Sequence, residues 1–196
     1  MTIVPLLPTG DGHTALSEDD RLGLIPTDIA SRGDLFDEEQ RNIADALLRR
    51  VPSVAQLLDD HYLRGLHRAM FGATWKWAGT YRTSETNIGI AFHRIAEAVR
   101  TLVEDARAWV EHRTYEADEI AVRLHHRLVQ IHPFPNGNGR HSRIAADYLV
   151  QALGGRPFSW GANLDVDTDE LRRRYREALV RADMGEIGDL VVFARS

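Results

Sequence analysis

A histidine, two closely spaced glycines and two arginines fall within one short segment, residues 132–143, which reads H-P-F-P-N-G-N-G-R-H-S-R. Gly137 and Gly139 bracket Asn138, a pattern that predicts a turn whose free backbone N–H groups form an anion site at the start of a helix. Arg140 and Arg143 follow three residues apart on that helix, so we expect both guanidinium groups on one face, where each can bind phosphate.

His132 stands at the other end of the same segment. An imidazole that accepts a hydroxyl proton, next to N–H groups and arginines that stabilise phosphate charge, is the combination that phosphoryl or nucleotidyl transfer requires. Because the residue before Pro133 is disfavoured in a helix, the apolar helix through Leu124 and Leu128 should end near His132. A purely structural turn would account for the glycines, but not for the histidine and both arginines together.

Helices are expected to hold this loop, because apolar residues recur at helical spacing through most of the chain. Asp34 or Asp37 is available to cap the first helix, Ser53 the second and Thr168 the one near the C-terminus. Residues 71–82 break the periodicity and are expected to place tryptophans in the core. We find no internal repeat. The expected helices cover residues 37–51, 54–70, 92–113, 115–130, 140–153, 169–181 and 187–193.

Composition limits the function classes. The chain has 196 residues, no cysteine and a formal net charge of −5. The lack of cysteine excludes disulfides, thiolate metal sites and cysteine nucleophiles, and the negative charge argues against direct nucleic-acid binding, which needs a basic face. We see neither a signal-peptide pattern nor an apolar run long enough to cross a membrane, so we expect a cytoplasmic protein with no membrane partner.

The segment from His132 to Arg143 resembles the Fic-family signature H-x-F-x-[D/E]-G-N-G-R-x-x-R and departs from it at Asn136. Residues 77–82, W-A-G-T-Y-R, are similar to the segment that precedes the β-hairpin flap of that family. The resemblance covers roughly residues 53–193 and implies a mainly α protein, a Fic-type helical bundle with a short hairpin flap at 83–90. It predicts an N-terminal arm and first helix over residues 1–52 and a Fic domain over 53–196.

The family also implies an activity. Fic proteins with this motif typically transfer AMP from ATP to a Tyr, Ser or Thr hydroxyl of a target protein. By this resemblance His132 is the general base, Phe134 is a buried anchor of the loop, and the flap residues Thr86, Asn87 and Ile88 dock the target. Mg²⁺ is expected to bridge the phosphates of ATP. The residues expected to bind the nucleotide phosphates are Asn136, Gly137, Asn138, Gly139, Arg140 and Arg143.

Asn136 stands where the family normally has an acidic metal ligand, and a neutral amide is a weaker ligand for Mg²⁺ than a carboxylate. We therefore expect weak metal binding by Asn136. Three interpretations stay open: a slower AMP transferase, a Fic-fold transferase of another phosphate-linked group, and a nucleotide-binding or interaction module without turnover. The retained His132, Asn138 and two arginines favour the first.

Two further histidines are assigned structural roles. His67 is expected to be a hydrogen-bonded interior residue, and His125 matches a position where Fic proteins often carry a structural histidine. A zinc site that combines His125 with His132 is disfavoured, because Pro133 breaks the helical geometry and no acidic residue shares the His125 face at a suitable spacing.

Regulation and partners are predicted from resemblance alone. The Fic inhibitory motif [S/T]-x-x-x-E-[G/N] has its nearest approach at residues 14–19, T-A-L-S-E-D, which ends in Asp and is not counted as a match. G-L-I-P-T at residues 23–27, together with the loop, resembles the bacterial Fic subgroup called mobile mystery protein B. Members of that subgroup accompany a small helix-turn-helix protein, which is the expected partner. Without an internal inhibitory motif, either a separate antitoxin-like protein restrains the enzyme or the Asn136 change makes restraint unnecessary.

Overall fold

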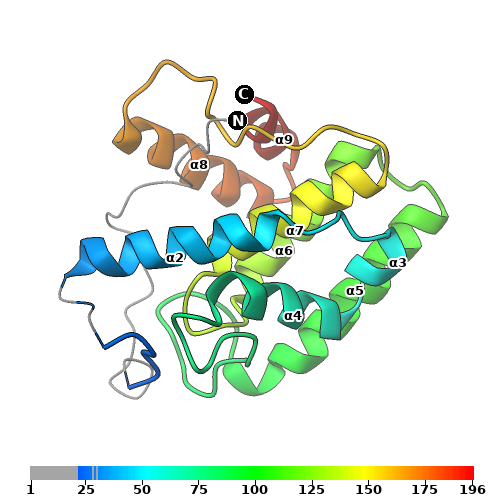
Figure 1. The fold of residues 1–196 in the computed structure, drawn as a ribbon. Coiled ribbons are helices and arrows are strands. Elements are labelled where there is room, and N and C mark those ends of the chain that lie inside the picture. Colours follow the sequence, from blue (N-terminus) through cyan, green and yellow to red (C-terminus); the bar gives the residue numbers. More distant parts are fainter. Residues whose placement is uncertain (1–21, 28, 30) are drawn as a thin grey trace.

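A computed structural model describes residues 22–27, 29 and 31–196 (Figure 1). Most of the predicted N-terminal arm, with residues 14–19, lies outside these residues. The part described is mainly helical, as predicted, and contains no strand; Leu24 and Trp75 form an isolated antiparallel bridge. The helices are α2 (Arg32–Leu47), α3 (Val54–Leu57), α4 (Asp60–Phe71), the 3-10 turn η1 (Phe92–Arg94), α5 (Ile95–Glu111), α6 (Ala117–Ile131), α7 (Asn138–Ala152), α8 (Thr168–Asp183) and α9 (Gly188–Arg195).

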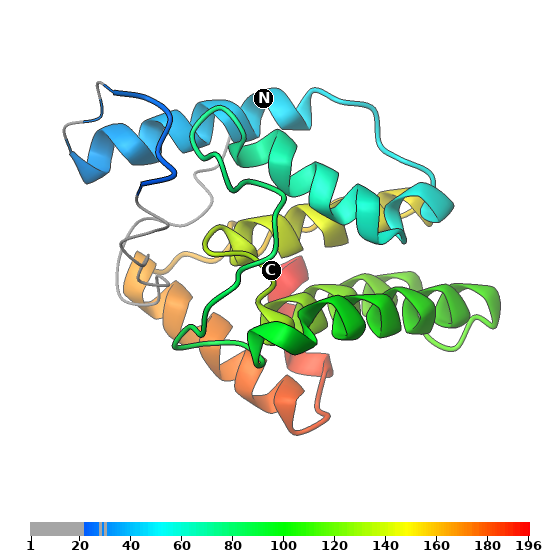
Figure 2. The same cartoon turned by 90° about the horizontal axis from the view of Figure 1, so that it is seen from below.

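Helices α6 and α7 form the centre of the molecule. Figure 2 shows α2 and α4 on one side of α7, with α5, α6 and α8 on the other. Leu124 and Leu128 on α6, and Ala145 and Leu149 on α7, are at most 1% exposed. The small Ala145 side chain permits close packing along α7, and burying large apolar side chains on both helices supplies the main stabilisation of the pair. The loop between these two helices is therefore anchored by the core.

Capping residues account for the helix boundaries that differ from the predictions. Ser31, not Asp34 or Asp37, is the N-cap of α2, and Asp34 completes a capping box with it. Ser53 caps α3 as predicted, but the helix expected over residues 54–70 is broken after Leu57. Asp59 caps a new helix there by accepting a hydrogen bond from the backbone N–H of residue 62.

The tail of the chain shows the same kind of difference. Thr168 was expected to cap α8, whereas Asp167 is the cap and its carboxylate accepts from the Glu170 N–H at 2.8 Å. The aromatic segment follows the prediction: Trp75 is 3% exposed, and its ring stacks on that of Trp77 with centroids 5.0 Å apart. Within the described residues, no helix is long and apolar enough to span a membrane.

The β-hairpin flap expected over residues 83–90 is not confirmed, because these residues form an irregular loop without paired strands. The physical reason is the Arg82 side chain. Its guanidinium donates hydrogen bonds to the carbonyl oxygens of Ser84 and Ile90, one on each limb of the loop. A side chain thus occupies the space between the limbs and satisfies carbonyl groups that a hairpin ladder would pair with N–H groups.

Candidate functional site

The loop that carries the predicted chemistry joins α6 to α7, as expected. Helix α6 ends at Ile131, and His132 follows in the left-handed conformation with φ 53° and ψ 62°. Gly137 is also left-handed, with φ 78°, and α7 begins at the next residue. Two left-handed residues therefore bracket the loop and bring its histidine and the start of α7 to the same short segment.

The two loop glycines have different roles. A Cβ on Gly137 would lie 2.5 Å from the Cε2 atom of Phe71, so the close packing and the positive φ both require glycine there. A Cβ on Gly139 would meet no atom within 4 Å, and this residue is exposed. Gly137 is needed by the fold, whereas Gly139 leaves open space above the first turn of α7.

The start of α7 has the free N–H groups that the glycine pattern predicts. The first helical hydrogen bond runs from His141 N–H to the Gly137 carbonyl at 2.9 Å. The N–H groups of Asn138, Gly139 and Arg140 precede it and have no acceptor within the helix. Together with the dipole of α7, a helix of 15 residues, these N–H groups can attract an anion, and their role in phosphate binding stays a prediction.

Asn138 is arranged differently from the prediction. Its side chain was expected to contact phosphate, yet it is 3% exposed and bound to the loop. The Oδ1 atom accepts from Phe134 N–H at 2.9 Å, and Nδ2 donates to the Phe134 carbonyl at 2.8 Å. The amide closes the loop on itself, which leaves the backbone N–H of Asn138 as its predicted contribution to phosphate binding.

Arg140 has a partner that the sequence did not reveal. Its Nη1 atom lies 2.7 Å from Oε2 of Glu39 on α2, and its guanidinium lies over the Phe71 ring at 4.8 Å. The other Glu39 oxygen accepts from Trp75 Nε1 at 2.7 Å, and Glu39 is 5% exposed. The signal that was missed is a glutamate on the apolar face of a helix, one turn before the buried Ile43. This pair crosses the domain boundary predicted at residue 52.

Arg143 does not share the surroundings of Arg140. It is 4% exposed, and its guanidinium carbon lies 4.5 Å from the ring centroid of Tyr175 on α8 and 5.7 Å from that of Trp160. The two arginines were expected on one phosphate-binding face, but one packs against α2 and the other toward α8. Besides phosphate binding, the family resemblance allows Arg143 to support the loop, and its burial fits that second role.

His132 is 8% exposed. Burial lowers its pKa from 6.5 to about 4, with the positive charge of Arg82 acting in the same direction and a backbone hydrogen bond at Val129 acting against it. The imidazole is therefore neutral at neutral pH. A neutral ring can accept a proton, which is what a general base must do.

His67 is the interior histidine that the sequence predicts. Its Nδ1 accepts from Gly79 N–H at 3.0 Å, so Nε2 carries the proton and donates to the Asn136 carbonyl at 3.0 Å. The ring stacks on Phe134 with centroids 3.8 Å apart, and Phe134 is 1% exposed, which confirms its burial. Burial holds the pKa of His67 well below its usual value. This histidine fixes the middle of the loop.

Two more buried histidines support the helices around the loop. His141 Nε2 lies 2.9 Å from the Leu63 carbonyl, and burial lowers its pKa to about 4. His125 Nε2 lies 3.0 Å from the Tyr175 hydroxyl, so its predicted packing role agrees with its fully buried position. In the part of the chain that the structure describes, no three His, Cys, Asp or Glu side chains are grouped to hold a metal.

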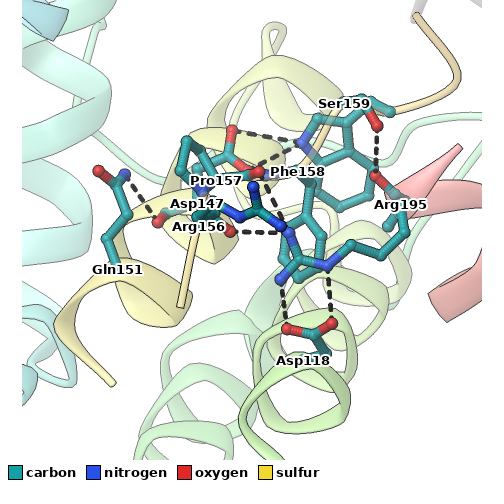
Figure 3. A network of polar contacts seen from close by, with 10 residues as sticks. Asp118, Asp147, Gln151, Arg156, Pro157, Phe158, Ser159 and Arg195 are labelled. Carbon is teal, nitrogen blue, oxygen red and sulfur yellow. Dashed lines mark hydrogen bonds and ion pairs between the residues drawn. The ribbon is translucent and has the colours of Figure 1, made fainter. Parts of the chain in front are cut away.

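A polar network between α7 and the C-terminal part of the chain was not predicted. Figure 3 shows Asp118 facing Arg195, and Asp147 beside the segment 156–159. The Asp147 carboxylate accepts from Phe158 N–H at 3.0 Å and from Trp160 Nε1 at 3.1 Å, and burial raises its pKa to about 7. Asp147 follows Arg143 by one turn of α7, so the network ties the C-terminal part of the chain to the helix that carries the motif.

Asn136 was predicted to be a weak ligand for Mg²⁺. Its Oδ1 accepts from the N–H of Gly137 at 2.6 Å, so the one side-chain oxygen is turned back to the loop. The amide carries no charge, and Mg²⁺ prefers charged oxygen. Asn136 is therefore at most the weak ligand that the sequence predicts, and its metal-binding role stays a prediction.

The predicted docking residues Thr86, Asn87 and Ile88 lie in the irregular loop that replaces the hairpin. Thr86 Oγ1 donates to the Ile88 carbonyl at 2.5 Å, which stabilises the tip. Ile88 is 39% exposed, unusual for a large apolar side chain. Their target-docking role stays a prediction.

Comparisons with known proteins agree with this geometry. The family model described as Fic/DOC family matches residues 57–150. The protein named protein adenylyltransferase fic-1 of Caenorhabditis elegans is 29% identical over 130 residues, which cover 64% of this chain and 24% of that protein. The protein named uridine 5'-monophosphate transferase of Xanthomonas campestris is 41% identical over 54 residues, 24% of this chain and 10% of that protein. The aligned regions thus span about a quarter or less of these relatives.

Solved structures share the fold. A Fic-1 fragment from C. elegans has a TM-score of 0.66 and 21% identity, and the match covers 87% of this chain and 50% of that one. The BepC protein of Bartonella tribocorum, solved with bound AMPPNP, has a TM-score of 0.67 and 18% identity over 91% of this chain and 97% of that one. The loop sequence, its position between α6 and α7 and the family match all agree. The chain belongs to the Fic/DOC family through residues 57–150.

Proposed function

We propose that this protein transfers AMP from ATP to a Tyr, Ser or Thr hydroxyl of a target protein and releases pyrophosphate. The observation that carries the proposal is the short loop with a neutral, buried His132 at one end and the free N–H groups of α7 at the other. The relatives named adenylyltransferase support the choice of AMP.

In this proposal the phosphates bind at the N-terminus of α7, through the N–H groups of residues 138–140 and the Arg140 guanidinium. Both stabilise the charge that develops on the phosphate oxygens. The target hydroxyl attacks the α-phosphorus while its proton passes to the His132 imidazole. The bond between the α-phosphorus and the bridging oxygen breaks, and pyrophosphate leaves. Thr86, Asn87 and Ile88 are proposed to align the target.

A second candidate is transfer of UMP from UTP. One observation favours it: the relative named uridine 5'-monophosphate transferase is 41% identical, a higher identity than that of the adenylyltransferase relatives, although over a shorter stretch. The chemistry at phosphorus would be the same, so the two candidates differ in the nucleobase, adenine or uracil, that the protein binds.

Intact-protein mass spectrometry separates the candidates. The wild type is incubated with a cell extract and either ATP or UTP, with Mg²⁺ present, and modified proteins are identified by the mass that they gain. Added AMP that is lost in His132→Ala supports the proposal, whereas added UMP supports the second candidate. His112→Ala, an exposed histidine after α5, is the matched control and should label as the wild type does. Nucleotide binding without any added mass would indicate a binding module instead.

A further inference from the structure

Arg82 is hydrogen-bonded to three consecutive carbonyl groups at the start of the loop between α6 and α7. Its backbone N–H donates to the Pro133 carbonyl at 2.9 Å, and its Nε donates to the His132 carbonyl at 2.7 Å. Its Nη2 lies 3.5 Å from the Ile131 carbonyl. The side chain is 1% exposed. One residue from outside the motif therefore holds the peptide groups on both sides of the proposed base.

The same guanidinium also holds the loop that stands in place of the hairpin. Nη1 donates to the Ser84 carbonyl at 2.9 Å, and Nη2 donates to the Ile90 carbonyl. The Ile90 N–H in turn lies 3.4 Å from the Ile131 carbonyl. Both ends of the loop 84–90 are thus joined to the segment that carries His132, and Arg82 supplies most of the connections.

His132 needs such support because its backbone is left-handed, with φ 53°. A residue with a Cβ is strained in this conformation and keeps it only where the surroundings enforce it. The hydrogen bond from the Arg82 side chain to the His132 carbonyl fixes the orientation of the peptide group that follows this strained residue. The hydrogen bond from the Arg82 backbone N–H to the Pro133 carbonyl fixes the next peptide group. The direction of the imidazole depends on both.

Gly89 gives independent support for the contact between loop and base. It has φ 110°, and a Cβ built on it would lie 2.6 Å from the His132 Cβ and 2.8 Å from Arg82 Nη2. The backbone of the loop therefore packs directly on the histidine and on the guanidinium, with no room for a side chain between them.

We propose that Arg82 is a positioning residue that holds the His132 peptide in its left-handed conformation and fixes the loop 84–90 beside the imidazole. The base and the loop proposed to dock the target are thereby kept in one relative arrangement. The consequence for catalysis rests on the proposed function, while the positioning itself can be measured in the free protein.

Arginine suits this task better than lysine. Its planar guanidinium presents five N–H donors in fixed directions and reaches acceptors on both sides, whereas an ammonium is a single point from which donors diverge. Arg82→Lys keeps the positive charge but loses the simultaneous hydrogen bonds. Arg82→Gln loses both the positive charge and the guanidinium donors. The two variants therefore separate geometry from electrostatics.

The first test is NMR of the free protein without nucleotide. In the wild type, the Nε–H signal of Arg82 should persist and exchange slowly, unlike that of Arg100, which is exposed on α5. Both Arg82 variants should shift the imidazole signals of His132 and the amide signals of residues 86–90. Arg82→Gln should also raise the His132 pKa, because a nearby positive charge is removed, and Arg82→Lys should not.

The control variant is Arg107→Lys. Arg107 on α5 also donates from Nε to a backbone carbonyl, that of Leu58 at 2.9 Å, and this acceptor belongs to neither loop. It should leave the His132 signals unchanged. In the labelling assay, both Arg82 variants should lower kcat by about 100-fold, because the base is misplaced. The KM for ATP should change by no more than about threefold, since the phosphate site is untouched.

Several outcomes decide the proposal. Folded Arg82 variants with unchanged His132 signals would overturn it. If the variants do not fold, hydrogen exchange of the Arg82 Nε–H in the wild type tests the proposal. Exchange as fast as that of the Arg100 Nε–H would overturn the proposal, and slow exchange would support it. Signals that shift as expected, in a protein that labels no target with any nucleotide, would support the positioning role and count against the proposed function.

Discussion

His132 and the two glycines of its loop are the residues on which the proposed chemistry depends. Sequence alone located them, because the motif is local and its glycines and proline determine the backbone. It did not predict that Asn138 would close the loop or that Arg143 would pack toward α8. Those positions depend on Phe134 and Tyr175, and the second of these comes from a distant helix.

The pH dependence of the reaction tests the state of His132. Because burial lowers its pKa to about 4, His132 is deprotonated throughout the neutral range, and the proposed reaction should slow only when acid protonates the ring. The value of kcat/KM for the wild type should therefore be flat from neutral pH downward and fall only near pH 4. Initial rates of labelling across this range provide the measurement. An acid limb centred at 6.5, the ordinary histidine value, would show that the ring is not in the buried environment described.

Alanine at the two loop glycines should separate fold from ligand binding. Gly137→Ala meets Phe71 and a positive φ, so it should lower the free energy of unfolding by more than about 2 kcal/mol. Gly139→Ala meets nothing in the protein and should change stability by no more than about 1 kcal/mol, yet a methyl group over the free N–H groups should weaken ATP binding.

Denaturant titration and calorimetry with ATP measure these two effects. Gly65→Ala is the control: Gly65 is exposed on α4, a Cβ there also meets nothing within 4 Å, and ATP binding should be unchanged. If Gly139→Ala binds ATP as the wild type does, the nucleotide phosphates do not lie on the first turn of α7.

At the scale of elements, the sequence did not predict the ion pair that joins α2 to α7. Periodicity and capping residues located most helices, since both are local signals. The break at Asp59 was missed because a periodic apolar face continues across it. The hairpin was predicted from resemblance, and its replacement by an irregular loop depends on where the Arg82 side chain lies, which no local pattern encodes.

The pair between Glu39 and Arg140 predicts a trade between stability and nucleotide affinity. Glu39→Gln leaves a largely buried guanidinium without its carboxylate, which should lower the free energy of unfolding by about 3 kcal/mol. The phosphates of ATP can then neutralise Arg140 without competing with Glu39, so the variant should bind ATP more tightly. Thermal unfolding with and without ATP checks both expectations. Without ATP the variant should unfold at a lower temperature than the wild type, and ATP should raise its unfolding temperature by more. A Glu39→Gln protein that gains less from ATP than the wild type would show that Glu39 prepares Arg140 for the nucleotide instead of competing for it.

For the whole molecule, five buried histidines with lowered pKa values predict sensitivity to acid. Each takes up a proton on unfolding below its ordinary value of 6.5, so unfolding becomes more favourable as the pH falls from 6.5 toward 4. Asp147 acts in the opposite direction, since its raised pKa of about 7 makes the folded protein bind the extra proton between 3.8 and 7. Because the five histidines outnumber this one carboxylate, the free energy of unfolding should decrease as the pH falls from 6.5 to 4.

Denaturant unfolding at several pH values measures this slope, which is about 1.4 kcal/mol per pH unit for each proton taken up on unfolding. Asp147→Asn removes the opposing carboxylate. The free energy of unfolding should then fall more steeply with decreasing pH, by the slope that corresponds to about one additional proton taken up on unfolding. Stability that is constant between pH 6.5 and 4 would mean that the buried histidines are already protonated in the folded protein.

The central claim, that His132 is the base in a transfer of AMP, is tested most directly by ATP radiolabelled at different phosphorus atoms. The protein is incubated with a cell extract and ATP that carries the label on either the α- or the γ-phosphorus. The proposal predicts that a protein in the mixture acquires the α label and not the γ label, and that His132→Ala abolishes the transfer. Transfer of the γ label, or equal α labelling by wild type and His132→Ala, would contradict it.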